Sequence, residues 1–255
     1  MSVLSLLVQL FWPGFVRWTE RPRPGRQGII QLKSVSTASS STTRSVSPNC
    51  LIYLPDNYGS ASHKWPLVIF LHGSGARGDD PLLVRQDGLP RLLDQGLPFS
   101  GIVVSPQCVQ AQSWHPETVL DVVSEIKDRY RVDPDRISIC GYSMGAYGAW
   151  EAAAAAPERF SAVLTVAGGA DAKLAKKLNA IPIWAFHGDH DETVPIQSTE
   201  AIVRAIRDVG GAPRLDVLHG FGHAIQRQVF ARPEVSSWLL QQTRHHHVAE
   251  RRRPP

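Results

Sequence analysis

Short runs of apolar residues recur along this chain, and stretches with helical periodicity separate most of them. Most of these runs consist almost entirely of Val, Ile and Leu, which is typical of strands that are covered on both faces. Strands that alternate with helices favour βαβ units, and βαβ units build a mostly parallel sheet. The expected strands cover residues 50–54, 67–71, 102–105, 137–140, 162–166, 183–186 and 215–218.

Helical spacing is clearest over residues 117–130, where Val119, Val122 and Ile126 recur on one face. A second helix is expected to start at Met144 and to run through an alanine-rich stretch as far as Pro157, which cannot continue it. Further helices are expected over residues 199–209 and 229–242. The sequence therefore predicts an α/β fold in which helices cover both faces of a mostly parallel central sheet.

Composition divides the chain into one globular domain and two ends of low complexity. Of the 255 residues, 43% are hydrophobic and 20% are charged, as in one ordinary domain, which we place at residues 49–242. Residues 17–48 are rich in Arg, Pro, Ser and Thr, and residues 1–48 are predicted to be a disordered or low-complexity segment, with order beginning near Cys50. Residues 243–255 are predicted to form a disordered, basic and histidine-rich tail.

The distribution of charge argues against a nucleic-acid partner. The formal net charge is +4, but arginines gather near the two ends, and acids and bases roughly balance between them. A domain that binds nucleic acid needs a basic face, and no such face is visible in the sequence.

The expected compartment is cytoplasmic. Cys50, Cys108 and Cys140 cannot all pair and show no CxxC spacing, which favours a reducing environment. The first 16 residues are apolar but too short to span a bilayer, so stable membrane insertion is not expected. Export is the alternative, if this segment is a degenerate signal peptide.

The stretch Gly141-Tyr142-Ser143-Met144-Gly145 joins an expected strand to an expected helix. A serine on such a sharp turn has strained backbone angles, and the flanking glycines allow the neighbouring chain to approach closely. Its hydroxyl then stands clear of the sheet at the positive end of a helix, where a developing oxyanion is stabilised. Ser143 is therefore the candidate nucleophile; the alternative is a glycine-rich turn with a capping serine.

The glycine-rich segment that starts at His72 and reads HGSGARG follows the expected strand 67–71 directly. Ser74 and Met144 are expected to supply the backbone N–H groups of an oxyanion hole, because such a hole pairs an early loop with the residue after the nucleophile. The segment lacks the Gly-Lys-Ser/Thr ending of a phosphate-binding loop. His72 is expected to brace this loop.

Three acids compete in the segment HGDHDETVP, which follows the expected strand 183–186: Asp189, Asp191 and Glu192. An acid at the carboxyl end of this strand can orient a histidine on a neighbouring loop. The alternative is a metal site, because His187, Asp189 and His190 form an HxDH pattern. Position 185 is Ala, where a binuclear metal cluster would place a further histidine, so no metal is predicted.

His223 lies in the segment GFGH, after the expected strand 215–218, and glycines precede it. A loop histidine at this place can act as the general base that takes the proton of Ser143. The competing histidines are His72 and His219, and His219 is expected to face the packing layer.

Taken together, the motifs occur in the order oxyanion loop, serine, acid and histidine, which is the order of the α/β-hydrolases. From about residue 51 to residue 240 the chain resembles the small esterase branch of that superfamily, which includes dienelactone-hydrolase-like, phospholipase/carboxylesterase-like and prolyl-oligopeptidase-like proteins. The segments that carry the resemblance are LPDNY, WPLVIFLHGSGARGDD, IVVSPQC, YRVDPDRISICGYSMGAYGAW, PIWAFHGDHDETVP and GFGH.

The resemblance implies a cofactor-free serine hydrolase that cleaves carboxylic esters of small molecules through an acyl-enzyme. It assigns Asp191 as the acid of the triad and His223 as its base. The sequence departs from the family's usual pattern at Ala146, where glycine is commoner, and in the loop that follows His223.

The resemblance also bears on access to the site. Cap domains of the superfamily typically follow the strand that here covers residues 162–166, and residues 167–180 are too few to form one. An open cleft is therefore expected, lined by the loop 106–116, with Trp114, Arg77 and Tyr142 as candidate substrate contacts. The oligomeric state stays undetermined.

Two other functions remain as alternatives. A peptidase of the prolyl-oligopeptidase type shares these motifs, but that group normally carries an N-terminal propeller, which about 50 low-complexity residues cannot form. A non-catalytic binding protein on a hydrolase scaffold is the other, and it would be expected to lack a triad residue.

Overall fold

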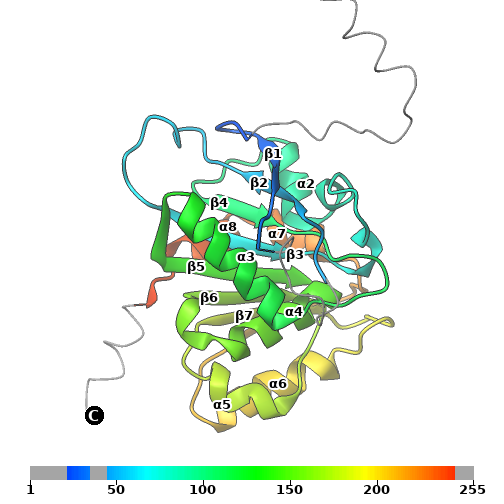
Figure 1. Cartoon of the computed structure of the whole chain (residues 1–255). Helices are drawn as coiled ribbons and strands as arrows, with labels where there is room; N and C mark the ends of the chain where they lie inside the picture. Colours follow the sequence, from blue (N-terminus) through cyan, green and yellow to red (C-terminus); the bar gives the residue numbers. More distant parts are fainter. Residues whose placement is uncertain (1–21, 35–44, 245–255) are drawn as a thin grey trace, which may run out of the picture.

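The computed structural model describes residues 22–34 and 45–244, and within these ranges eight strands form one sheet (Figure 1). The strand order is β1-β2-β4-β3-β5-β6-β7-β8. The strands β1 and β2 are antiparallel to their neighbours, whereas β4, β3, β5, β6, β7 and β8 run parallel. The strands are β1 (Gln27–Gln31), β2 (Asn49–Tyr53), β3 (Trp65–Leu71), β4 (Ile102–Ser105), β5 (Val132–Tyr142), β6 (Ala162–Val166), β7 (Ile183–Gly188) and β8 (Arg214–Leu218).

Helices cover both faces of this sheet, as the sequence predicts (Figure 1). One layer contains α3 (Pro116–Arg129), α4 (Met144–Ala155), α5 (Ala175–Leu178) and α6 (Gln197–Asp208). The other contains α2 (Gly88–Asp94), α7 (Gln226–Phe230) and α8 (Pro233–Gln241). The predicted α/β architecture is confirmed.

Alternation along the central strands produces the two-sided core. On β3, Leu67 and Ile69 belong to the core beneath α3 and α4, whereas Val68 and Phe70 belong to the core beneath α2 and α7. Successive side chains of a strand point to opposite faces, so a strand that is buried on both faces must be apolar throughout. Each such side chain contributes roughly 1.5–3 kcal/mol when it is fully buried. This burial explains why uninterrupted apolar runs located the strands.

Two expectations about the chain's elements are wrong. The predicted single helix 229–242 is two helices, α7 and α8, because Pro233 lacks an N–H group and Arg232 before it is extended, at φ −74° and ψ 122°. Ordered structure also begins before Cys50: β1 pairs antiparallel with β2, from Gln27 opposite Tyr53 to Gln31 opposite Asn49. The apolar run in β1 consists of only two residues, Ile29 and Ile30, and the Arg- and Pro-rich sequence before it gives no strand pattern.

Other predictions fall outside the described residues. These are the apolar segment 1–16, the Ser/Thr run 39–43 and nearly all of the tail 243–255. None of the described helices is both long and apolar enough to cross a membrane.

The segment between β6 and β7 is short, as expected. Residues 167–182 contain only a single 3₁₀ turn, η4 (Ala172–Leu174), and α5. Within residues 22–34 and 45–244 the chain has an α/β-hydrolase fold, and no cap domain is inserted between β6 and β7.

Candidate active site

Ser143 occupies the sharp turn between β5 and α4. Its backbone lies at φ 53° and ψ −119°, a conformation that costs a non-glycine residue about 1–3 kcal/mol. A Cβ atom at position 141 would lie 2.1 Å from the carbonyl oxygen of Gly145, and one at position 145 would lie 1.9 Å from that of Leu71. Only glycine fits at either position, so the helix start packs directly against the strand ends and holds Ser143 in place.

The hydroxyl of Ser143 does not cap the helix that it precedes. Its side chain makes no capping hydrogen bond to α4. Instead, Ser143 Oγ lies 2.9 Å from His223 Nε2. This contact excludes the interpretation of Ser143 as a simple capping residue.

His223 connects Ser143 to Asp191. His223 Nδ1 lies 2.8 Å from Asp191 Oδ2, and because a carboxylate can only accept, Nδ1 carries the proton. Nε2 is then free to accept a hydrogen bond from the hydroxyl of Ser143. The loop that carries His223 packs closely on β7, where a Cβ atom at Gly188 would lie 2.2 Å from the carbonyl oxygen of Phe221. The structure thus brings together the three residues that the sequence singled out.

The carboxylate of Asp191 is buried and held by several donors. Its Oδ1 accepts hydrogen bonds from the N–H groups of Thr193 at 2.9 Å and Val194 at 2.8 Å. Burial alone would raise the pKa of Asp191, but the hydrogen bonds from Val194 and His223 outweigh it and hold the pKa below its ordinary value. Asp191 is therefore an anion at neutral pH.

His187 is a part of this network that the sequence analysis did not foresee. It is fully buried, and its Nε2 lies 3.1 Å from Asp191 Oδ2 and 2.9 Å from the carbonyl oxygen of Val194. Both of these partners are acceptors, so Nε2 carries a proton and donates. Its Nδ1 lies 2.7 Å from Thr199 Oγ1. The available signal was a histidine at the end of a buried strand, four positions before the acid.

The HxDH pattern does not assemble as a metal cluster. His187 is engaged with Asp191, while Asp189 binds His219. Over residues 22–34 and 45–244, no group of three or more His, Cys, Asp or Glu side chains is placed to hold a metal ion.

The competing acid Asp189 lies in a different environment. Its Oδ2 is 2.9 Å from His219 Nδ1, and its Oδ1 accepts from the N–H of Gly220 at 2.7 Å. The hydrogen bond from His219 is the main reason that the pKa of Asp189 is lowered. The expectation that His219 faces the packing layer is wrong: its side chain is 85% exposed, because β8 is the last strand of the described sheet and His219 lies in the turn that follows its end at Leu218. The third candidate acid, Glu192, is exposed.

The loop after β3 lies against the serine. A Cβ atom at Gly73 would lie 3.5 Å from Ser143 Cβ, so this loop touches the candidate nucleophile. Ser74 begins the 3₁₀ turn η1 (Ser74–Ala76), and Met144 begins α4. N–H groups at helix starts have no partner within the helix. Among the described residues, neither of these two N–H groups donates a backbone hydrogen bond.

His72 braces this loop, as expected. Its Nε2 accepts from the N–H of Cys108 at 3.0 Å, and its backbone oxygen accepts from Trp114 Nε1 at 3.1 Å. Burial lowers the pKa of His72 to about 4, so the ring is neutral, and both of its nitrogens are occupied, Nδ1 by the carbonyl oxygen of Gly73 and Nε2 by the N–H of Cys108.

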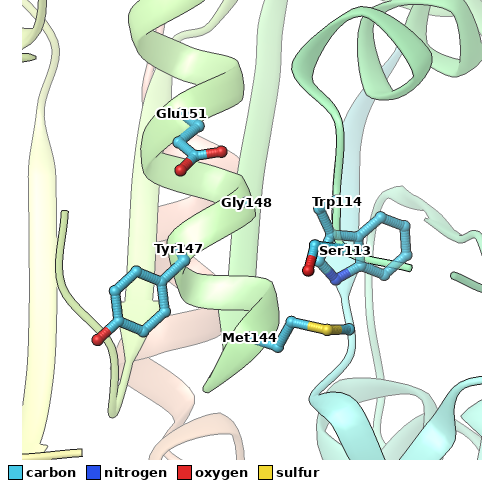
Figure 2. A pocket seen from close by; sticks show the side chains of 6 residues that line it. All are labelled: Ser113, Trp114, Met144, Tyr147, Gly148 and Glu151. Atoms are coloured by element: carbon cyan, nitrogen blue, oxygen red, sulfur yellow. The ribbon is translucent and has the colours of Figure 1, made fainter. Parts of the chain in front are cut away.

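The expected substrate contacts differ in their surroundings. Trp114 is almost fully buried but forms part of the wall of a groove beside α4 (Figure 2). Tyr142 is half-buried, its ring centroid lies 5.2 Å from that of His223, and burial raises its pKa to about 12. Arg77 is half-buried beside Cys108.

Known proteins resemble this chain over most of its described length. A curated relative, Putative esterase NocK of Nocardia uniformis subsp. tsuyamanensis, is 27% identical over 165 residues, 58% of this chain and 46% of that protein. The Bifunctional acetylxylan esterase/xylanase XynS20E of Neocallimastix patriciarum is 24% identical, and the match covers 62% of this chain and 23% of that protein. The matches thus span less than half the length of these two relatives.

Solved structures share the fold. A thermostable esterase superposes with a TM-score of 0.70 at 27% identity, covering 86% of this chain and 63% of that chain. A ferulic acid esterase superposes with a TM-score of 0.64 at 18% identity and shows a shared fold alone. The model of one protein family, described as Putative esterase, matches residues 40–252. Because this match covers well over half of the chain, the protein belongs to that family.

Proposed function

We propose that this chain hydrolyses carboxylic esters of small molecules through an acyl-enzyme formed on Ser143. The observation that carries the proposal is the unbroken contact chain from Ser143 Oγ to His223 Nε2, at 2.9 Å, and from His223 Nδ1 to Asp191 Oδ2, at 2.8 Å. A serine hydroxyl becomes a nucleophile when a positioned base can remove its proton, and the base must itself be oriented by a third group.

In the first half of the reaction, Ser143 Oγ attacks the carbonyl carbon of the ester while His223 Nε2 takes the hydroxyl proton. The carbonyl oxygen becomes an oxyanion, and the unpaired N–H groups of Ser74 and Met144 stabilise it. His223 then gives its proton to the alkoxy oxygen, the C–O bond breaks, and the alcohol leaves.

In the second half, a water molecule attacks the acyl-enzyme and His223 accepts a proton from it. The resulting tetrahedral intermediate collapses, the bond to Ser143 Oγ breaks, and His223 returns the proton to Ser143. The carboxylic acid leaves. Asp191 remains ionised throughout, because its hydrogen bonds favour the anion, and it stabilises the imidazolium of His223.

The proposal is tested with a fluorophosphonate probe and with para-nitrophenyl acetate. We expect the probe to label Ser143 and the Ser143→Ala variant to lose turnover by roughly 10⁴-fold or more. Labelling of another residue, or turnover in Ser143→Ala close to that of the unaltered chain, would overturn the assignment.

A further inference from the structure

Tyr142 lies beside the triad but takes no part in the reaction described above. It ends β5, directly before Ser143, and its backbone pairs with Val166 of β6. The N–H of Ser143 continues this pairing and lies 2.9 Å from the carbonyl oxygen of Val166. Since β5 lies between β3 and β6, the backbone here has little freedom, and the Tyr142 ring projects from a fixed base.

The Tyr142 ring packs on the loop after β3 and lies next to the imidazole of His223. A Cβ atom at Gly73 would lie 3.0 Å from Tyr142 Cδ1 and 3.2 Å from its Cε1, so glycine at this position lets the ring approach the loop. The centroids of the Tyr142 and His223 rings are 5.2 Å apart, and the two rings are tilted by 39°. Because the tyrosine ring occupies the space on one side of the imidazole, it limits the rotation of His223.

The hydroxyl group of Tyr142 does not explain this arrangement. Burial raises the pKa of Tyr142 to about 12, and the charges of Asp87 and Asp191 act in the same direction. The phenol is therefore neutral at physiological pH and cannot serve as a base. No described residue forms a hydrogen bond with this hydroxyl. The ring is thus the part of Tyr142 that acts on His223.

The charge of His223 changes during the proposed reaction, and an aromatic ring responds to that change. His223 is a neutral imidazole while its Nε2 accepts from Ser143, and it becomes an imidazolium when it takes the proton. An aromatic face attracts a cation within about 6 Å of its centroid, and the separation of 5.2 Å lies within this range. An attraction that is stronger in the transition state than in the ground state raises kcat.

We propose that Tyr142 is a positioning residue whose ring confines the imidazole of His223 and stabilises the imidazolium as it forms. The proposal rests on the function proposed above, since the imidazolium forms only if His223 takes the proton of Ser143. Tyr142 acts through His223, so loss of the ring should lower kcat and leave KM nearly unchanged. The rival is the substrate contact that the sequence led us to expect, which would change KM.

The first test replaces Tyr142 and measures the hydrolysis of para-nitrophenyl acetate. In Tyr142→Leu the ring is lost, and we expect kcat to fall by about tenfold or more, because the base is no longer held in the reactive position. Tyr142→Phe keeps the ring and should retain most of kcat. In both variants KM should stay within about twofold of its value in the unaltered chain.

A second series separates the charge of the ring from its shape, and it stays informative if Tyr142→Leu fails to fold. At position 142, para-fluoro-, difluoro- and pentafluorophenylalanine resemble phenylalanine in shape but withdraw negative charge from the ring face in increasing steps. We expect kcat to fall in that order, by about two- to fivefold between phenylalanine and the pentafluoro ring.

The matched control for this series is the same set of replacements at Tyr130. This tyrosine is half-buried at the end of α3, and its ring lies near Tyr58 and Arg129. Its ring also lies next to a cation but not next to His223, so kcat should not depend on the number of fluorine atoms there.

Three results would overturn the proposal. One is an equal kcat in Tyr142→Phe and Tyr142→Leu, and another is a kcat that does not change along the fluorinated series at position 142. The third is a rise in KM at unchanged kcat, which would make Tyr142 a substrate contact. In each case the unaltered chain still hydrolyses the ester and its Ser143 is still labelled by the fluorophosphonate probe. An unaltered chain with neither turnover nor labelling would overturn the proposed function itself.

Discussion

Two aspartate–histidine pairs lie at the ends of β7 and β8. They consist of the same two residue types but differ in burial and in the groups that they contact. Asp191 and His223 are 2.8 Å apart, and Asp189 and His219 are 2.9 Å apart. The side chain of Asp191 is 0% exposed, whereas that of Asp189 is 30% exposed. The first pair ends on Ser143 Oγ, and the second ends in solvent.

Because both pairs have the same short contact, that contact alone does not identify the pair that we propose to be catalytic. The buried pair is enclosed by further donors, from Thr193, Val194 and His187, and hydrogen bonds are electrostatically stronger where water is excluded. The exposed pair connects two loops and is screened by solvent. Burial and the contact with Ser143 distinguish the pair that we propose to be catalytic from the exposed pair.

Replacing each aspartate by asparagine tests the difference between the two pairs, and it has the largest expected effect. In Asp191→Asn the amide can present an N–H group to His223, which turns the imidazole to the wrong tautomer, and we expect kcat to fall by about 10³–10⁴-fold. Steady-state hydrolysis of para-nitrophenyl acetate measures the effect, with Asp189→Asn as the matched control. Equal losses in the two variants would show that the buried pair has no special role.

The contribution of His187 is the next largest expected effect. His187 donates to Asp191 without touching a substrate, so it is a positioning residue. In His187→Leu one donor to a buried carboxylate is lost, and we expect kcat to fall about tenfold with little change in KM. His187→Gln, whose amide can still donate, should retain more of the rate. If kcat falls equally in the two variants, or if KM rises while kcat stays unchanged, the assignment of His187 as a positioning residue is wrong.

The pH dependence of the melting temperature tests whether Asp191 is an ionised, hydrogen-bonded acid. The folded-state pKa of Asp191 is lowered, so its contribution to stability is fully present above the unfolded value of about 3.9 and is lost as the pH falls through the folded value. At pH 7 the melting temperature of Asp191→Asn should be about 3–6 °C lower than that of the unaltered chain. That gap should narrow as the pH falls from 5 towards 2.5. A constant gap over this range would contradict the assignment of an ionised, hydrogen-bonded Asp191.

Much of this arrangement could be predicted from the chain because it depends on local pattern. The apolar runs located β3 to β8 to within two residues of each expected start and end, except that β5 begins five residues before its expected start, since strands buried on both faces need apolar residues throughout. Ser143 and His223 could be chosen because each follows a strand that runs in the same direction. Parallel strands end at one edge of the sheet, so residues far apart in sequence meet there.

What could not be predicted depends on contacts between distant segments. The strand β1 is stable only beside β2, and its two isoleucines stand among Arg and Pro residues that conceal them. The hydrogen bond from His187 to Asp191, and the packing of Trp114 on Gly148, likewise have no periodic signal. The direction of His219 follows from the position of β8 at the edge of the sheet, which the strand pattern does not reveal.

The smallest expected effect concerns the exposed pair. Asp189 links two loops through His219 and through the N–H of Gly220, three positions before His223. Because the pair is solvent-exposed, we expect Asp189→Asn to lower kcat by about two- to threefold at most, with KM unchanged. The pKa of Asp189 is also lowered, so any stabilisation it provides is present at neutral pH and disappears on acidification. A loss approaching that of Asp191→Asn would mean that this outer pair holds the His223 loop in place, and the distinction between the two pairs would then be one of distance from Ser143 rather than of role.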